Sequence, residues 1–242
     1  MYNYFKGSNG EDREGNTMRN FFARMTFVSA TILFAGFAAG YASDRPGANL
    51  PNPAVDAPVA TAKGEQTAVV AGGCFWGIQA VFQHVKGVVS ATSGYSGGSA
   101  KDAEYEIVSS GTTGHAESVK IVFDPSQITY GQLLKVFFSV AHDPTQLNRQ
   151  GPDVGRQYRS SIFFGSDEQK RIAEAYIAQL GNAAAFQRKI VTEVVPLKAF
   201  YAAEAYHQDY ATLHPNEPYI VVNDAPKVVH LRAEFPSLYV NR

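Results

Sequence analysis

The sequence predicts a two-layer α+β domain in which helices cover one face of a β-sheet. From residue 66 onward, segments with strand periodicity alternate with segments whose apolar residues recur at helical spacing. Two expected strands follow one another with no helix between them, and this interleaving is typical of a two-layer sheet-and-helix domain. Aromatic residues make up 12% of the chain, which is enough to fill the core between the layers.

The first half of the domain is expected to hold three strands and one long helix. Residues 67–71 form an apolar run that predicts a buried strand, and a helix follows from Phe75. Further strands are expected at residues 87–95 and 115–124. The apolar positions behind these assignments are Ile78, Val81, Phe82 and Val85 in the helix, and Val119, Ile121 and Phe123 in the last strand.

The second half carries two helix-start signals. Thr129 with Gln132, and Ser166 with Gln169, have the spacing of a capping box, and the second helix is expected to end at Gly181. Residues 160–164 and 189–195 read as strands, and residues 200–210 as a helix. The remaining C-terminal tail is interrupted by prolines and is predicted to be long and irregular.

The N-terminal part of the chain differs from the rest. Arg19 and Arg24 precede an apolar run of roughly 17 residues, at the lower edge of spanning length, which ends in small residues at Ala42. Residues 1–42 are therefore expected to be a signal peptide, or alternatively an uncleaved membrane anchor, and Met18 is a second candidate start. Residues 43–65 are rich in proline and predict a disordered linker, which leaves residues 66–242 as one folded domain.

Charge and cysteine content restrict the possible functions. The formal net charge is −1, so no concentrated basic surface argues for nucleic acid binding. Cys74 is the only cysteine, which rules out an internal disulfide and a lipid-modified cysteine after the apolar run. We expect an exported monomer, in the periplasm or held at the membrane by its N-terminal segment.

Cys74 follows two glycines and precedes Phe75 and Trp76, between an expected strand and an expected helix. A cysteine at a helix N-terminus faces free N–H groups and the positive end of the helix dipole, both of which favour the thiolate. A lone cysteine can also be an inert core residue. The glycines and the adjacent aromatic residues favour a nucleophile here.

Glu117 lies near the start of the strand at residues 115–124, beside apolar neighbours and on the face opposite Ala116. Burial there would raise the pKa of its carboxyl and suit it to be a general acid near neutral pH. The alternative is an exposed glutamate at a strand end. His115 and Glu117 could suggest a metal pair, but two ligands without a third group do not make a metal site.

Residues 142–159 form a long polar loop of a kind that is usually functional or mobile. Asp143 could equally be a turn residue before a proline, and Arg156 and Arg159 could be solvated surface residues. Tyr95, Tyr105 and Tyr158 could be core aromatic residues whose hydroxyl groups are hydrogen-bonded.

Several motifs together resemble those of the peptide-methionine (S)-S-oxide reductases, the A-type methionine sulfoxide reductases. The resemblance covers residues 67–238, and the motifs occur in the expected order. They are Gly73-Cys74-Phe75-Trp76-Gly77, residues 93–98 (SGYSGG), residues 111–117 (GTTGHAE), residues 149–160 (RQGPDVGRQYRS) and residues 207–210 (HQDY). The resemblance implies a sandwich around a mixed β-sheet, which with the predicted element order suggests a ferredoxin-like arrangement.

The resemblance also implies roles for individual residues. Cys74 would attack the sulfoxide sulfur, and Phe75 with Trp76 would hold the S-methyl group. Glu117 would give a proton to the sulfoxide oxygen. The remaining implied site residues are Tyr105 and Tyr158, which would donate hydrogen bonds to that oxygen, and Asp153, which would position water and the thiol after the first step. The substrate would be free or protein-bound methionine-S-sulfoxide, and the product on the enzyme a sulfenic acid.

The chain departs from many similar proteins in having no second thiol. Ser109 stands where some members have a cysteine, and the tail around Tyr219 has none. No bound cofactor is expected, and recycling would need an external thiol: a thioredoxin-like or glutaredoxin-like protein, or a small thiol. The rival interpretations are a cysteine–histidine hydrolase using His115 or His207, and a non-enzymatic redox sensor.

Overall fold

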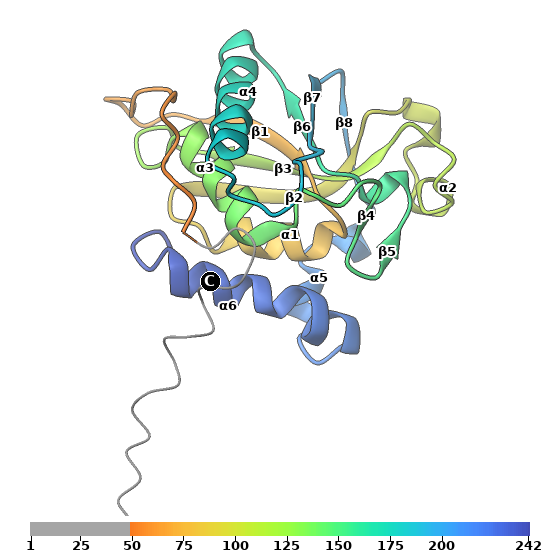
Figure 1. Cartoon of the computed structure of the whole chain (residues 1–242). Coiled ribbons are helices and arrows are strands. Elements are labelled where there is room, and N and C mark those ends of the chain that lie inside the picture. Colours follow the sequence, from red (N-terminus) through yellow and green to blue (C-terminus); the bar gives the residue numbers. More distant parts are fainter. Residues whose placement is uncertain (1–48) are drawn as a thin grey trace, which may run out of the picture. The chain divides into compact units, whose positions relative to one another are not determined.

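The computed structural model describes residues 49–242, and the expected signal or anchor segment lies outside them. Six strands form a mixed sheet in the order β7-β6-β1-β3-β2-β8 (Figure 1). The inner four, β1 (Gln66–Ala71), β2 (Val88–Ser96), β3 (Ala116–Phe123) and β6 (Ser161–Phe164), are paired antiparallel in the order 6-1-3-2. This is the ferredoxin-like arrangement, so the α+β prediction is confirmed.

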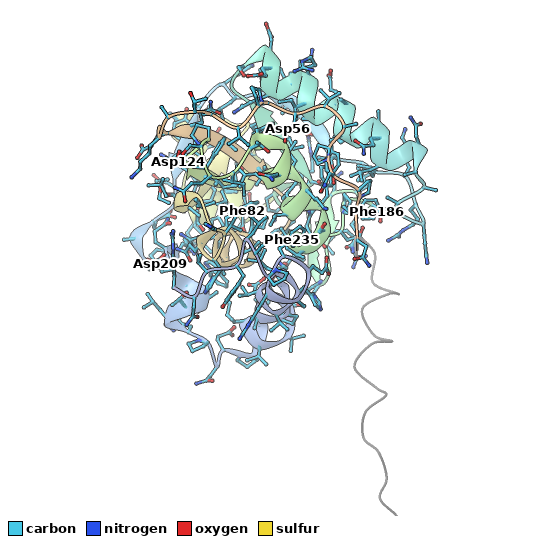
Figure 2. The ribbon with its side chains drawn as sticks, turned by 90° about the vertical axis from the view of Figure 1, so that its left-hand side faces the viewer. Asp56, Phe82, Asp124, Phe186, Asp209 and Phe235 are labelled. Atoms are coloured by element: carbon cyan, nitrogen blue, oxygen red, sulfur yellow. The ribbon has the colours of Figure 1, made fainter. Side chains whose placement is uncertain are left out.

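Helices α1 (Phe75–Gln83) and α3 (Tyr130–Val136) pack on one face of the sheet, and a π-helical turn (Phe137–Ala141) continues α3. Side chains of β1 alternate between two clusters, because successive residues of a strand point to opposite faces. Ala68 and Val70 belong to the large core under the helices, while Val69 and Ala71 belong to a small cluster on the other face. Phe82 lies in the middle of the large core (Figure 2).

Both predicted helix starts are present. Thr129 and Gln132 exchange the two hydrogen bonds of a capping box at the start of α3. Ser166 accepts a hydrogen bond from the backbone N–H of Gln169 at the start of α4 (Asp167–Asn182). Both helix starts could be predicted from the sequence because each signal is complete within four residues.

The edges of the sheet differ from the prediction. Strand β7 (Glu193–Pro196) is shorter than expected and runs parallel to β6. Residues 200–210 are not one helix: they hold edge strand β8 (Phe200–Ala202), a 3₁₀ turn (Ala205–His207) and the start of α5 (Tyr210–Leu213). Pairing of β8 with β2 overrides the local helical pattern, as tertiary contacts commonly do.

The C-terminal tail is more helical than predicted. A π-helical turn (Ile220–Asp224) leads into α6 (Ala225–Glu234), which packs against α1 on the side away from the sheet (Figure 1). One of the prolines that suggested irregularity, Pro226, stands in the first turn of α6, a position at which proline is well tolerated. The smaller elements are α2 (Tyr105–Val108), the hairpin of β4 (Arg149–Gln150) and β5 (Asp153–Val154), and 3₁₀ turns at Ala100–Asp102 and Arg156–Tyr158.

Residues 49–65 are not a disordered linker, which corrects the prediction for that part of 43–65. Leu50 is buried in the core, and Asp56 accepts hydrogen bonds from the Thr129 hydroxyl and the Gly131 N–H at the start of α3 (Figure 2). Farther along, the Gly64 N–H bonds Asp124. The prolines limit secondary structure here, but they do not prevent an extended segment from docking. No helix within residues 49–242 is long and apolar enough to cross a membrane.

Candidate active site

Cys74 occupies the N-cap position of helix α1, directly after the turn that leaves β1. Gly73 has φ = 102°, a conformation that side chains rarely adopt, and a Cβ there would come within 2.6 Å of Gln150. The two glycines therefore allow a tight turn under the β4–β5 hairpin. As predicted, this turn places the thiol between the end of strand β1 and the start of helix α1.

Glu117 lies beside the same helix start. It shares a face of β3 with Val119 and Ile121, so the strand alternation turns the carboxyl toward α1 and away from water. Its Oε2 accepts a hydrogen bond of 3.1 Å from the Phe75 N–H, and only 2% of the residue is exposed. Burial raises the pKa of Glu117 to about 8, despite the opposing effect of the hydrogen bond. The exposed alternative is thereby excluded.

The thiol of Cys74 does not gain the low pKa that its helix position suggests. Burial raises its pKa well above the ordinary value, and the carboxylates of Glu117 and Asp224 raise it further. A hydrogen bond from the backbone N–H of Trp76 and the charge of Lys227 lower the pKa of Cys74, but they do not reverse the shift. Desolvation outweighs the helix terminus because only 7% of Cys74 is exposed, so water does little to stabilise a thiolate there.

Trp76 is held by the segment HQDY. Its indole Nε1–H donates to Nδ1 of His207 at 3.2 Å, and its ring stacks on Tyr210 with centroids 3.8 Å apart. Tyr219 meets the indole edge-on at 6.1 Å. The indole is half-buried and has a defined orientation, so it can offer an apolar surface next to Cys74.

Phe75 is 1% exposed and faces the core. Its ring lies 5.9 Å from that of Tyr95 and 5.0 Å from the imidazole of His207. Phe75 therefore stands behind the site as part of its apolar floor, whereas Trp76 is the more accessible of the two.

Tyr105 is brought to the site by Glu204, a residue that the sequence did not single out. One carboxylate oxygen of Glu204 accepts from the Tyr105 backbone N–H and the other from the Tyr95 hydroxyl, each at 2.8 Å. The ring of Tyr105 lies 4.5 Å from that of His207. Burial and the charge of Glu117 raise the pKa of Tyr105, so its hydroxyl keeps its proton and can donate a hydrogen bond.

Tyr158 and Asp153 come from the β4–β5 hairpin and the turn after it. Burial, followed by the charges of Glu117 and Asp153, raises the pKa of Tyr158, which also remains a donor. Asp153 accepts a short hydrogen bond from the hydroxyl of Tyr219 in the C-terminal tail. The site is thus closed by two segments about 66 residues apart in sequence.

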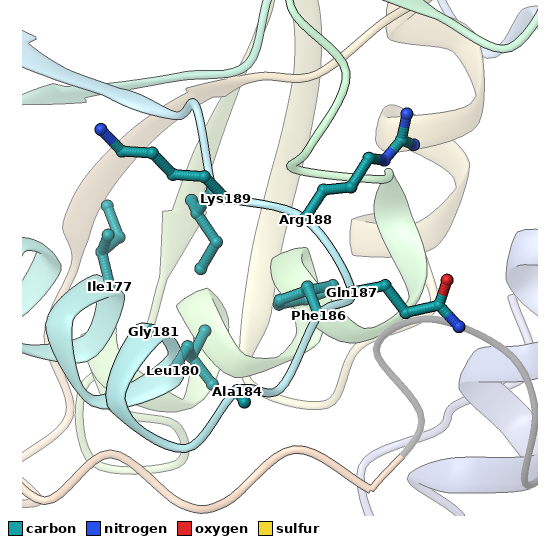
Figure 3. A pocket seen from close by; sticks show the side chains of 9 residues that line it. Ile177, Leu180, Gly181, Ala184, Phe186, Gln187, Arg188 and Lys189 are labelled. Atoms are coloured by element: carbon teal, nitrogen blue, oxygen red, sulfur yellow. The ribbon is translucent and has the colours of Figure 1, made fainter.

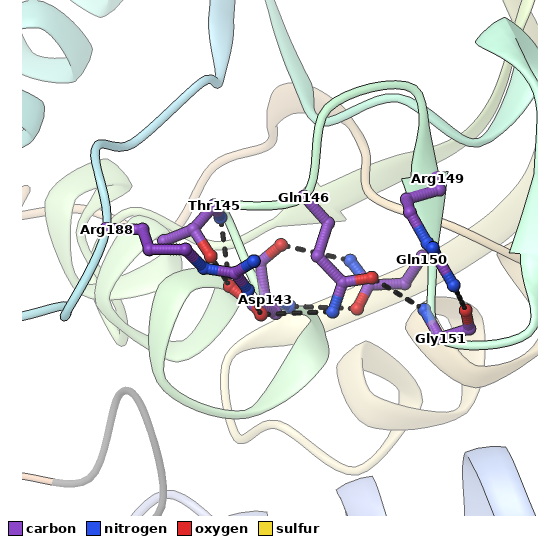
Figure 4. Close-up of polar contacts among 7 residues, drawn as sticks. All are labelled: Asp143, Thr145, Gln146, Arg149, Gln150, Gly151 and Arg188. Carbon is purple, nitrogen blue, oxygen red and sulfur yellow. Dashed lines mark hydrogen bonds and ion pairs between the residues drawn. The ribbon is translucent and has the colours of Figure 1, made fainter.

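The polar loop that carries this hairpin is cross-linked. Asp143 accepts hydrogen bonds from the Thr145 backbone and hydroxyl and from the Gln146 side chain, and it pairs with Arg188 (Figure 4). The Gln150 side chain bonds both the N–H and the carbonyl of Asp143. Asp143 is therefore a turn residue, the alternative left open from the sequence, and the loop presents Asp153 on a rigid base.

Two polar residues of the motifs serve the scaffold. His115 is fully buried, with Nε2 2.9 Å from the Ser99 carbonyl and Nδ1 accepting from the Gly98 N–H, so it has no free nitrogen to act as a base. Arg159 is 6% exposed, so the interpretation as a solvated surface residue was wrong: it donates to the carbonyls of Gly114 and His115 and pairs with Glu193. Both residues hold the turn before β3 in position and thereby fix the position of Glu117.

His207 accepts from Trp76 through Nδ1, so its proton sits on Nε2. That nitrogen is 3.9 Å from Glu204 and has no hydrogen-bond partner among residues 49–242. Burial lowers the pKa of His207, and the ring orients the indole. This geometry does not support the hydrolase interpretation, in which His207 would face Cys74 as a base.

Sequence reasoning missed the contribution of the tail. Tyr219, Asp224 and Lys227 all act on Cys74 or Asp153, yet they lie in a segment that reads as irregular. A signal was present in the short apolar run around Ile220, which is buried in the structure.

Other features of the described chain are separate from this site. A cavity of about 460 Å³ lies between the end of α4 and residues 184–190, and no site residue lines it (Figure 3). Within residues 49–242, no three histidine, cysteine, aspartate or glutamate side chains are grouped as a metal site.

Comparison with known proteins gives consistent results. The family model described as peptide methionine sulfoxide reductase matches residues 66–238. Two proteins described as peptide methionine sulfoxide reductase MsrA 2 are similar: one from Mesorhizobium japonicum, 62% identical over 74% of this chain and 91% of its own, and one from Synechocystis, 54% identical over 77% and 88%. Methionine sulfoxide reductase A of Corynebacterium diphtheriae has a similar structure, with a TM-score of 0.55 and 35% identity over 71% of this chain and 85% of its own. Reduced Mxr1 of Saccharomyces cerevisiae gives 0.57 and 32% over 66% and 91%.

Proposed function

The chain belongs to the peptide methionine sulfoxide reductase family and reduces methionine sulfoxide, and on this premise we propose that Cys74 is the attacking group of a one-cysteine cycle. The observation that carries the proposal is the juxtaposition of a buried thiol with a buried carboxyl at the start of α1. The substrate is the S epimer of the sulfoxide, free or in an oxidised protein.

In the first step the sulfur of Cys74 bonds to the sulfoxide, while Glu117 protonates the sulfoxide oxygen. A sulfoxide oxygen leaves poorly until it is protonated, so nucleophile and acid must act together. Tyr105 and Tyr158 donate hydrogen bonds to that oxygen as it gains charge, and Asp153, held by Tyr219, positions water and the thiol afterwards. The protonated oxygen leaves as water, and a water molecule then bonds to the Cys74 sulfur and breaks its bond to the substrate sulfur. Methionine leaves, Cys74 is left as a sulfenic acid, and the substrate sulfur is reduced as the cysteine sulfur is oxidised.

The methyl group of the substrate rests on Trp76, with Phe75 beneath it. Methyl burial on an aromatic surface distinguishes methionine sulfoxide from more polar side chains. The stacked Tyr210 and the His207 hydrogen bond keep the indole from rotating away when the site is empty.

Recycling uses an external thiol because Cys74 is the only cysteine of the chain. A first thiolate attacks the sulfenic sulfur, releases water and forms a mixed disulfide; a second thiol then restores Cys74 and leaves as a disulfide. A thioredoxin-like or glutaredoxin-like protein or a small thiol can fill this role. No resident cofactor takes part, and the enzyme works as a monomer.

Intact-mass spectrometry after one equivalent of methionine sulfoxide tests the proposal. Without thiol, we expect about one methionine released per chain and a mass gain of one oxygen on Cys74. Added thiol should restore turnover through a mixed disulfide. Repeated turnover without reductant, or a Cys74→Ser variant that still releases methionine, would refute the one-cysteine cycle.

Export rests on the N-terminal sequence. Arg19 and Arg24 before an apolar run that ends in small residues support cleavage near Ala42, with the mature enzyme in the periplasm. N-terminal sequencing of native material is the test: residues 18–42 retained would indicate a membrane anchor instead.

A further inference from the structure

An ion pair in the C-terminal tail lies directly against the first turn of helix α1. The Lys227 ammonium donates to Oδ1 of Asp224 at 2.9 Å, and the Asp224 side chain is fully buried. A Cβ added to Gly77 would lie 2.1 Å from that Oδ1 and 2.7 Å from the Lys227 nitrogen. Gly77, three residues after Cys74, therefore lacks a side chain where the pair touches the helix.

The hydrogen bonds of this ion pair do not explain why it is buried. Oδ2 of Asp224 has no hydrogen-bond partner among residues 49–242, although a buried carboxylate normally has several. Burial raises the pKa of Asp224, which the adjacent Lys227 opposes. Burying an incompletely satisfied ion pair is weak evidence for stability, so another use must be considered.

Several charged or titratable groups surround the sulfur of Cys74. Glu117 of β3 and the tail residues Asp224 and Lys227 act on it electrostatically. The phenols of Tyr105, Tyr158 and Tyr219 interact electrostatically with it from three other segments. Lys227 is the cation in this set, and its charge lowers the pKa of Cys74, whereas Asp224 raises it.

We propose that Asp224 and Lys227 are positioning residues that set the charge balance at Cys74: Lys227 stabilises the thiolate, and Asp224 anchors the ammonium against Gly77. The anchor opposes that stabilisation, because its own charge is negative, and its effect on the pKa of Cys74 is the larger of the two. The thiolate consequently keeps a high proton affinity and with it a high nucleophilicity, which falls as the proton affinity of a thiolate falls. This inference rests on the proposed role of Cys74 as nucleophile.

The test is the pH dependence of Cys74 alkylation by iodoacetamide, followed by intact mass. Because Cys74 is the only cysteine, every alkylated chain reports on this site. Lys227→Met keeps the aliphatic stem but removes the cation, and should shift the midpoint upward by on the order of one pH unit. Asp224→Asn keeps an oxygen that can hold Lys227 but removes the anion, and should shift the midpoint downward.

Midpoint shifts of opposite sign in the two variants distinguish an electrostatic role from a packing role, because loss of packing at either residue would disturb the site in the same way. Lys227→Arg should stay near wild type, and the double variant Asp224→Asn/Lys227→Met should return toward it. The control is Lys170→Met, which removes an exposed ion pair with Glu174 on α4 and should shift nothing.

Shifts of the same sign, or none, in variants whose thermal unfolding stays cooperative would overturn the inference. If Lys227→Met does not fold, Asp224→Asn decides alone: an unshifted or raised midpoint in folded protein refutes it. Alkylation needs no sulfoxide, so these results stand apart from the methionine-release assay. Failure of sulfenic acid formation in that assay would instead refute the proposed role of Cys74.

Discussion

Replacing Glu117 by glutamine should slow sulfoxide reduction because it removes a proton that burial has made available. With a pKa of about 8, Glu117 is about 90% protonated at pH 7, whereas a carboxyl at its ordinary value of 4.5 would be about 0.3% protonated. Burial thus enlarges the acid population about 300-fold at that pH. Glutamine keeps the shape and can still accept the Phe75 N–H bond, but it has no transferable proton.

The expected loss is about two to four orders of magnitude in the rate of sulfenic acid formation, the usual share of general acid catalysis. Substrate affinity should change far less, because the methyl group rests on Trp76. The assay is single-turnover methionine release at saturating methionine sulfoxide between pH 6 and pH 9. Glu174→Gln, an exposed change on α4, is the matched control and should behave as wild type.

The pH dependence gives a second criterion. The acid form of Glu117 is lost as pH rises through about 8, so the advantage of wild type over Glu117→Gln should be largest below pH 7 and shrink above pH 8. Taking the ratio of the two rates reduces the effect of Cys74 ionisation, which both proteins share. A variant with the wild-type rate, or a ratio that stays constant across this range, would refute the role of Glu117 as acid.

Three further predictions concern the stability of the fold and the stacking of Tyr210 on Trp76. Because the folded pKa of Glu117 exceeds its unfolded value, wild type should lose stability as pH rises from about 4.5 to about 8. In urea unfolding at pH 7, Glu117→Gln should therefore be more stable than wild type by on the order of 3 kcal/mol. Equal stability of wild type at pH 5 and pH 8 would contradict this. Asp56→Ala should lower the free energy of unfolding by about 2 kcal/mol, since it removes two charge-assisted hydrogen bonds at the start of α3; a change below about 0.5 kcal/mol would mean that residues 49–65 do not dock in solution. Tyr210→Ala should raise KM roughly three- to tenfold by freeing the indole of Trp76, whereas Tyr210→Phe keeps the stacked ring and should leave KM unchanged; equal effects of the two would rule out stacking as the cause.

Elements defined by local patterns were predictable from the sequence. The capping box at Thr129, the helix cap at Ser166, the apolar alternation of β3 and the glycine turn before Cys74 are each complete within a few residues. The same alternation placed Glu117 on one face with apolar residues, since a strand fixes which residues share a face, but the structure decided between a buried and an exposed carboxyl. Naming Cys74, Glu117 and the aromatic pair together needed the resemblance of several motifs, because no single one of them is specific.

What only the tertiary structure decided depends on contacts between distant segments. The docking of residues 49–65, the strand β8 and helix α6 each form because they bury surface against elements far away in the chain, and their own sequences are weak signals. The high pKa of the Cys74 thiol is of the same kind. The sequence placed the sulfur at a helix N-terminus, which favours the thiolate, but desolvation and the carboxylates of Glu117 and Asp224 exist only once β3 and the tail have closed around it, and these outweigh the local effect.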